Sequence, residues 1–348
     1  MKTLTSLIGR YRLLKQPISY KVSTNLKKIL RKFISYFIIS GLVYYLFLVV
    51  ETISLYFSEF GFDLTNGILF SFSQIPAVIN FGVFIGLILV TAELIKDKVP
   101  VSKFFQFGLI ASLIFGGLIF LLSNSVVPKL RMTSFLDRYE NARKEPFTSQ
   151  ERIEKATEYK KTNVDMMSIG LINQYSDSLE TENNSQKKII SDLFKKIPDS
   201  IIQNDFSKTE INEYGISKNE LTTEFNRRDL FQLKNEIRKN TLLTKQLRKS
   251  NWTKNTRYLN SFLTLFLVCF AIVIGANFKN QLIFSLVCIG IVIYSQTLTL
   301  LTTSSDYFIN GENLLGLIFK FTIILVIFLY LVYRMKTKKN TGVNNGYK

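Results

Sequence analysis

Hydrophobic side chains are concentrated in six long runs along the chain, and the segments between them are polar. Each run has about 20 residues or more, and at roughly 1.5 Å per residue a helix of that length crosses a hydrocarbon layer of roughly 30 Å. Buried helices of water-soluble domains keep a polar stripe, which these runs mostly lack. The pattern predicts an α-helical polytopic membrane protein that crosses the membrane at 33–57, 68–95, 104–123, 258–278, 281–303 and 313–334.

The six runs form two groups of three, separated by a long polar segment. We therefore expect six transmembrane helices in a 3+3 arrangement, with an external domain inserted between helices 3 and 4. The expected parts are a basic amphipathic segment at 1–32, transmembrane helices 1–3 within 33–123, the external domain at 124–257, transmembrane helices 4–6 within 258–334 and a tail at 335–348. Two groups that enter the membrane from opposite sides are often seen in transporters.

The inserted domain is predicted to be mainly helical, because helix-start patterns recur in it while strand-type alternation is scarce. A Ser or Thr followed three residues later by Glu forms a capping box, in which each side chain accepts a hydrogen bond from the backbone of the other residue. The pattern occurs at Thr148 with Glu151, Ser207 with Glu210 and Ser217 with Glu220. Each pair predicts the start of a helix.

Charge predicts the orientation of the helices. The chain has 44 Lys and Arg residues against 26 Asp and Glu, a formal net charge of +18. Residues 1–32 contain nine basic side chains and no acidic one, and the short loops that follow alternate between acidic and basic. Because short basic loops stay in the cytoplasm, both termini are expected there and the inserted domain in the periplasm. The predicted location is the bacterial inner (cytoplasmic) membrane.

The basic N-terminal segment is interpreted as a membrane anchor. Its apolar residues recur at helical spacing and its basic residues take the other faces, as in helices that lie on anionic lipid headgroups. About 30 residues provide no fold that recognises nucleic acid. Membrane lipid is therefore an expected partner, and nucleic acid is not.

Residue usage argues against chemistry carried out by the chain itself. It has no histidine, the commonest general acid or base and the commonest metal ligand. Cys269 and Cys288 lie in apolar runs and form no redox or metal motif. A phosphate-binding G-x-x-x-x-G-K motif does not occur either. We expect no enzyme, no cofactor and no metal site, and any ATPase that drives this protein must be a separate chain.

Small residues in the second and third runs predict close helix packing. Residues four apart lie on one helix face, and small side chains there let the backbones approach each other. The residues with this spacing are Gly82, Gly86, Gly108, Ser112 and Gly116. Pro76 should kink the second helix or unwind its outer turn, because proline cannot donate a backbone hydrogen bond.

Two ionisable residues lie well inside the predicted spans, Glu51 in the first and Lys320 in the sixth. Such residues are costly in a membrane and mark functional positions more often than surface charges do. Lys320 is either a contact for an anionic ligand or an interface anchor whose stem extends toward the headgroups. Glu51 cannot extend as far, so it faces either a polar cavity or a partner on another helix.

Three short motifs occur in an order and spacing that resemble a known family. They are Ser123 to Pro128 at the end of the third run, Phe72 to Ala92 with Pro76 and a following Glu93, and Ile274-Gly275 after Arg257. With the predicted topology, the chain resembles the permease subunits of the lipopolysaccharide-export ABC transporter, the LptF/LptG type. The resemblance covers the length, the 3+3 spans and the placement of the middle domain.

The resemblance implies a function and a set of site residues. The chain would be a permease-type subunit that moves a lipid or lipid-linked, lipopolysaccharide-like amphiphile out of the inner membrane. A cytoplasmic ATPase subunit would dock at Glu93, Lys96, Lys98 and Lys103, and a second permease-like subunit would enclose a lipid cavity with this chain. The residues expected at the cavity are Tyr44, Phe47, Glu51, Tyr294 and Lys320.

Two departures from the family support an alternative function. The family has a periplasmic β-jellyroll, whereas helices are predicted here. Its coupling segment contains a glycine-bearing helix, whereas this chain has Lys96 to Pro100 at that position. The alternative is a non-transporting membrane scaffold or assembly factor, which binds a periplasmic envelope protein through its helical external domain.

Overall fold

The computed structural model describes residues 18–56, 64–144, 146–195, 227–310 and 314–344, and helices make up nearly all of them. Six of the described helices contain stretches long and apolar enough to cross a membrane, which confirms the predicted class of multi-pass helical membrane protein. These stretches are Leu26–Ser54, Ile75–Lys96, Val101–Arg143, Phe231–Asn277, Ile283–Asn310 and Leu314–Met335.

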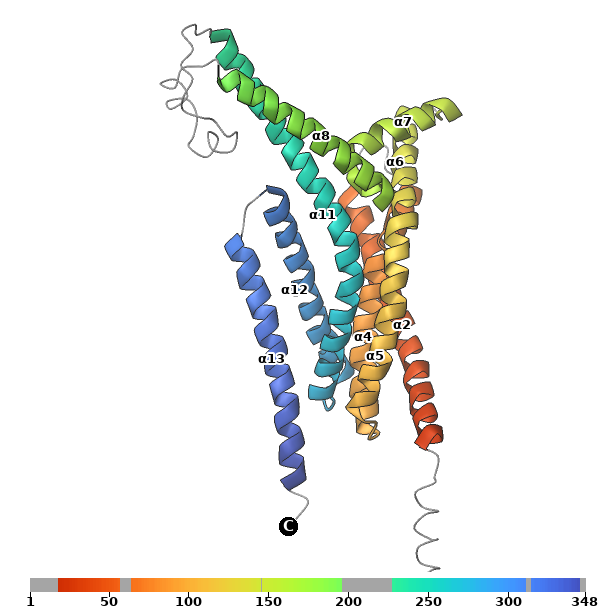
Figure 1. The fold of residues 1–348 in the computed structure, drawn as a ribbon. Coiled ribbons are helices and arrows are strands. Elements are labelled where there is room, and N and C mark those ends of the chain that lie inside the picture. The colour runs from red at the N-terminus through yellow and green to blue at the C-terminus, as the bar shows by residue number, and fades with distance from the viewer. Residues whose placement is uncertain (1–17, 57–63, 145, 196–226, 311–313, 345–348) are drawn as a thin grey trace, which may run out of the picture. The chain divides into compact units, whose positions relative to one another are not determined.

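Figure 1 shows the described helices in chain order. They are α2 (Ile18–Tyr56), α3 (Leu64–Phe72), α4 (Ile75–Lys96), α5 (Val101–Leu121), the π-helical turn η1 (Leu122–Val126), α6 (Val127–Arg143), α7 (Ser149–Thr162), the 3₁₀ turn η2 (Val164–Met166), α8 (Ile169–Phe194), α11 (Arg227–Asn277), α12 (Ile283–Asn310) and α13 (Leu314–Asn344). They belong to two compact units. The membrane unit contains the described residues up to Arg152, Arg257–Thr302 and those from Leu315 on; the hairpin unit contains Ile153–Thr256 and Thr303–Leu314.

Helix α4 forms the core of the membrane unit. In its most apolar stretch 83% of the residues are buried, against 17% in α2 and 11% in α13. A helix that is apolar on every side can be buried on every side, and α4 is buried on consecutive residues from Ile79 to Ala92. Helices α2, α5, α11 and α12 pack against α4.

Glycine lets three helices approach α4 closely. Gly82 and Gly86 of α4 lie against Phe37 of α2, where an added Cβ would stand 3.1 Å from the Phe37 carbonyl oxygen and 3.2 Å from its backbone nitrogen, respectively. On α11, a Cβ at Gly275 would lie 2.6 Å from the Ile88 carbonyl oxygen. On α12, a Cβ at Gly290 would lie 2.4 Å from the Ile85 side chain.

The small residues of α5 contact a different helix. A Cβ at Gly108 would lie 2.6 Å from Val268, and one at Gly116 would lie 2.9 Å from the carbonyl oxygen of Ser261, both on α11. Ser112 is buried between these glycines and donates a hydrogen bond to the Leu109 carbonyl oxygen at 2.8 Å. The small residues of the second and third spans thus face α2 and α11 respectively, and do not form one common seam.

Two prolines lie in the first turns of helices, Pro76 in α4 and Pro128 in α6. The second apolar run is divided into α3 and α4, and the break at Ser73 and Gln74 comes directly before the first turn of α4, which contains Pro76. Proline suits a first helical turn, where the missing N–H would have no partner. At Pro128, by contrast, the chain passes through η1 and continues as α6 to Arg143. A π-helical turn widens the helix and accommodates the proline ring.

Two helices continue beyond the apolar runs that predicted them. Helix α2 begins at Ile18, so the described part of the basic N-terminal segment is continuous with the first span. Helix α11 extends over 51 residues from the hairpin unit into the membrane unit. Residues 124–152, predicted as the start of the inserted domain, belong instead to the membrane unit, since α5, η1 and α6 follow one another without a loop.

The hairpin unit is built on α8 and the first half of α11. Buried residues of α8 recur at intervals of three and four, which is the heptad spacing of coiled coils. They are Ile169, Ile172, Ser176, Leu179, Asn183, Gln186, Ile190 and Leu193. Polar pairs join the two helices at Ser176 with Ser250, at Asn183 with Thr244 and at Gln186 with Glu236. Polar core residues of this kind fix the register of paired helices at a cost in stability.

The capping box predicted at Thr148 and Glu151 is confirmed. The Thr148 backbone N–H donates to the Glu151 carboxylate at 2.9 Å, and the Glu151 N–H donates to Thr148 Oγ1 at 3.3 Å. The hydrogen bonds from Thr148 lower the pKa of the Glu151 carboxyl, because they stabilise its charged form. Helix α7 begins at this point. The pairs predicted at Ser207 and Ser217 lie outside the described residues.

The close contact of α11 with α4 predicts that one added methyl group at Gly275 destabilises the protein. We expect Gly275→Ala to lower the free energy of unfolding by roughly 1–3 kcal/mol, because the added Cβ would press on the backbone of α4. Thermal unfolding of the solubilised protein measures this. Gly117→Ala on α5 is the matched control, since its Cβ would meet no atom within 4 Å. Equal loss in both variants would contradict the assignment of α4 as the packing core.

Candidate functional site

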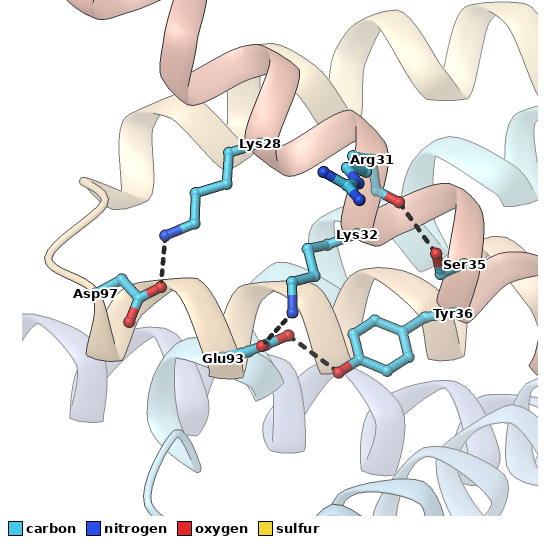
Figure 2. Close-up of polar contacts among 7 residues, drawn as sticks. All are labelled: Lys28, Arg31, Lys32, Ser35, Tyr36, Glu93 and Asp97. Atoms are coloured by element: carbon cyan, nitrogen blue, oxygen red, sulfur yellow. Dashed lines mark hydrogen bonds and ion pairs between the residues drawn. The ribbon is translucent and has the colours of Figure 1, made fainter.

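Ion pairs connect α2 to the Lys96 end of α4 (Figure 2). Lys28, Lys32 and Tyr36 are spaced four residues apart on α2, so they lie along one face. Glu93 and Asp97 are also four apart. The contacts are Lys28 Nζ to Asp97 Oδ2 at 2.7 Å, Lys32 Nζ to Glu93 Oε1 at 2.8 Å and Tyr36 Oη to Glu93 Oε2 at 3.0 Å. These five residues are called the ion-pair cluster below.

The cluster is only partly shielded from solvent. The side chains of Lys28 and Asp97 are 47% and 49% exposed, so added salt should weaken their attraction. The hydrogen bond and charge of Lys28 lower the pKa of the Asp97 carboxyl. A carboxyl with a lowered pKa stabilises the fold above its ordinary pKa, and this contribution is lost as the pH falls through the lowered value. The pair is therefore fully formed at neutral pH.

A tight turn connects α4 to α5. The Val99 N–H donates to the Leu94 carbonyl oxygen at 3.1 Å, and the Lys98 N–H donates to that of Ile95 at 3.1 Å. These two bonds define a Schellman motif, in which the residue after the helix takes a left-handed conformation and is usually glycine. Here that residue is Lys98, with φ of 61°. Helix α5 then begins after Pro100.

The four residues expected to couple to an ATPase lie around this turn. Glu93 is held within the chain by Lys32 and Tyr36. Lys96 and Lys98 are exposed, while Lys103 lies on α5 and donates to Gln106 at 3.0 Å. The turn contains no separate helix between α4 and α5. The turn thus carries two exposed basic residues, Lys96 and Lys98, close in the chain to a carboxylate that already has partners.

Sequence reasoning did not anticipate the ion-pair cluster. The basic residues of the N-terminal segment were assigned to lipid headgroups, yet Lys28 and Lys32 contact acidic residues of α4. The four-residue spacing on both helices was visible in the sequence. Their antiparallel register was not, because it depends on how Phe37 packs against Gly82 and Gly86.

Of the five residues expected at a lipid cavity, the structure brings Tyr44, Phe47 and Tyr294 together. The rings of Tyr44 and Phe47 are stacked, with centroids 6.5 Å apart. Tyr294 is 3% exposed, and its hydroxyl donates to the Ala77 carbonyl oxygen at 3.0 Å. Its ring packs edge-on against Tyr44, with centroids 6.0 Å apart. These two tyrosines are thus packing residues of the core. Phe47 and Glu51 lie on the exposed surface of α2, and Lys320 lies on α13.

Lys320 is half-buried and contacts α12. Its Nζ donates to the carbonyl oxygen of Thr299 at 3.5 Å. This contact brings the ammonium group beside a helix with several hydroxyl side chains. Both interpretations of Lys320, the contact for an anionic ligand and the interface anchor, stay predictions.

An apolar groove of about 300 Å³ lies where α2 passes the break between α3 and α4. Its lining residues are Phe37, Ile38, Gly41, Leu42, Tyr45, Phe72, Ile75 and Val78. None of the residues expected at a cavity lines it. In a membrane such a groove is filled by whatever apolar group surrounds the helices.

Comparison of the chain with protein family models, with curated proteins and with solved structures found no match. The site is therefore interpreted from its own geometry.

Relief of the left-handed turn should stabilise the protein. We expect Lys98→Gly to raise the free energy of unfolding by about 0.5–1 kcal/mol, because glycine adopts this conformation without a Cβ clash. Lys98→Ala distinguishes the effect of the backbone conformation on stability from the effect of the charge, since it removes the ammonium group but keeps the Cβ. An equal gain from Lys98→Ala in denaturant unfolding would show that charge, not conformation, limits the turn.

Charge reversal should test the contact between Lys32 and Glu93. Lys32→Glu and Glu93→Lys each place like charges together, so both variants should melt at a lower temperature than the wild type. The double variant restores an opposite pair and should melt closer to the wild type, by an amount that shrinks as salt is added. The same reversal of the exposed pair Lys155 and Glu158 on α7 should have little effect. Purely additive melting shifts would contradict the contact.

Proposed function

We propose that this chain is a permease-type subunit of an ABC transporter, which moves a lipid or lipid-linked amphiphile out of the inner membrane. The observation that carries the proposal is the connection between the α4–α5 turn and the core. The turn follows α4 directly, and α4 is in backbone contact with α2 and α11. A displacement of the turn by a nucleotide-driven subunit would therefore move the helix around which the membrane unit is packed.

The ion-pair cluster supports this mechanical role. It joins α2 to the last turn of α4 and to Asp97 of the α4–α5 turn. The ion-pair cluster connects the two helices at the Lys96 end of α4, and Phe37 contacts Gly82 further along. A displacement of α4 would therefore move α2 with it as a rigid body. Lys96 and Lys98 are left exposed beside the cluster and can attract an acidic surface of a partner.

The proposal includes the orientation and the partners. The charge pattern of the loops supports a cytoplasmic location for both termini and the α4–α5 turn, and with 3+3 spans the hairpin unit would lie in the periplasm. The chain has no phosphate-binding motif, so the ATPase is a separate subunit. A second permease-like subunit would complete the lipid path, and the hairpin unit is available to a periplasmic partner.

Co-purification tests the proposed function. The tagged chain, extracted from native membranes in mild detergent, should bring with it an ATPase subunit and a second membrane subunit. Lys96→Glu with Lys98→Glu should reduce recovery of the ATPase at least several-fold and keep the second membrane subunit, because only the turn is altered. Lys188→Glu on α8 is the matched control, as it reverses an exposed charge in the hairpin unit. Recovery of neither subunit with the wild-type chain would rule the proposal out.

The hairpin unit favours a second candidate function, a membrane scaffold or assembly factor. The described part of this unit consists of helices with heptad packing and contains no strand. It therefore lacks, over those residues, the strand-built surface that passes lipid onward in the family that the chain resembles. Replacement of residues 153–256 by a flexible linker discriminates between the candidates. A scaffold should lose its envelope partner, whereas a permease should keep its ATPase.

A further inference from the structure

Helix α12 carries a polar stripe where a membrane helix is expected to be apolar. Ser295, Thr299 and Thr302 are spaced four and three residues apart, so they lie on one face, with Gln296 beside them. Ser295, Gln296 and Thr302 are exposed and Thr299 is half-buried. All four belong to a candidate membrane span. Polar side chains at membrane depth face a polar cavity or a ligand more often than lipid.

The stripe is confined to one half of the helix. Toward Ile283 the same face continues with Phe284 and Val292, which are 78% and 60% exposed. The exposed face of α2 is likewise apolar over a long distance, at Ile38, Leu42 and Leu46. The polarity of α12 near Thr299 and Thr302 is therefore a local feature, and one helix face offers both an apolar and a polar section.

Lys320 of α13 stands beside this stripe, and the two helices run side by side (Figure 1). The Thr299 carbonyl oxygen accepts from Lys320 Nζ at 3.5 Å and from Thr302 Oγ1 at 3.0 Å. Lys320 lies six residues from Leu314, the first residue of α13, or about 9 Å along the helix. The ammonium group of Lys320 and the Thr302 hydroxyl thus share one acceptor, the Thr299 carbonyl oxygen.

We propose that Lys320 and the polar stripe of α12 bind the anionic, phosphate-type headgroup of an amphiphile. In a medium of low dielectric constant an ammonium group attracts an anion strongly. The Gln296 amide can donate to the same anion, and the hydroxyls of Thr299 and Thr302 can do so after rotation away from the carbonyls they now contact. Together with Lys320, these side chains would offer several donors to one anion.

The apolar surroundings favour an amphiphile over a small soluble anion. Phe319 flanks Lys320 and is 67% exposed, and Leu315 is 82% exposed. The acyl chain of an amphiphile can cover such side chains while the headgroup contacts Lys320. A free phosphate ion has no apolar part that could cover them. The inference rests on the proposed function in taking this ligand as the cargo, and it adds the chemical class of the headgroup.

Native mass spectrometry of the purified full chain can test the site without any partner subunit. With phosphatidylcholine as competitor, the wild type should retain dioleoyl phosphatidic acid, and Lys320→Gln should bind it about tenfold more weakly. Lys320→Arg should keep the binding, and Thr302→Val should weaken it less than Lys320→Gln does. Lys279→Gln is the matched control, because it removes an exposed cation from the turn between α11 and α12, before the Ile283 end of α12.

Two further arms make the result decisive. A photoreactive phosphatidic acid should cross-link to peptides of α12 and α13 in the wild type and not in Lys320→Gln. Inorganic phosphate at the same concentration should not displace the lipid. Displacement would overturn the proposal that the ligand is an amphiphile and would indicate a site for simple anions. Equal weakening by Lys320→Gln and Lys279→Gln would overturn the site itself. Because no ATPase is present, failure here is distinct from failure of the co-purification.

Discussion

Close backbone contact around α4 is the constraint on which the membrane unit depends. Lipid tails are as apolar as leucine side chains, so helices in a membrane associate through close packing. Gly82 and Gly86 on α4 and Gly275 on α11 let neighbouring backbones approach it, and Gly290 on α12 meets its side chains. Larger residues at these positions would push the neighbours outward. The burial of α4 on all sides and its direct connection to the α4–α5 turn both follow from this packing.

The ion-pair cluster acts within that packing and does not replace it. Its side chains are partly exposed, so its ion pairs add less than the contacts of Phe37 with the α4 glycines. Its effect is on rigidity, because two ion pairs and a tyrosine hydroxyl connect α2 to Glu93 in the last turn of α4 and to Asp97 directly after it. The site thus combines a stiff pair of helices with a turn that presents Lys96 and Lys98.

Local patterns predicted local structure well. The capping box at Thr148 and Glu151 forms as expected, since both partners are three residues apart and need no other element. The break before Pro76 is likewise a local consequence of proline chemistry. The fate of Pro128 was not predictable in this way, because η1 carries the helix past the proline to Arg143. Tyr294, which the resemblance assigns to a lipid cavity, is 3% exposed and packs edge-on against Tyr44.

The amino-acid sequence by itself determined that this is a helical membrane protein with six candidate spans. Each span satisfies its backbone hydrogen bonds internally, so its existence depends only on its own length and apolar content. Only the tertiary structure decided which helices contact one another. A glycine or an ionisable residue in the sequence indicates that a contact exists, but it does not indicate which helix provides the other side. The pairing of Lys32 with Glu93, the burial of Tyr294 and the approach of Lys320 to α12 all depend on the register between separate helices.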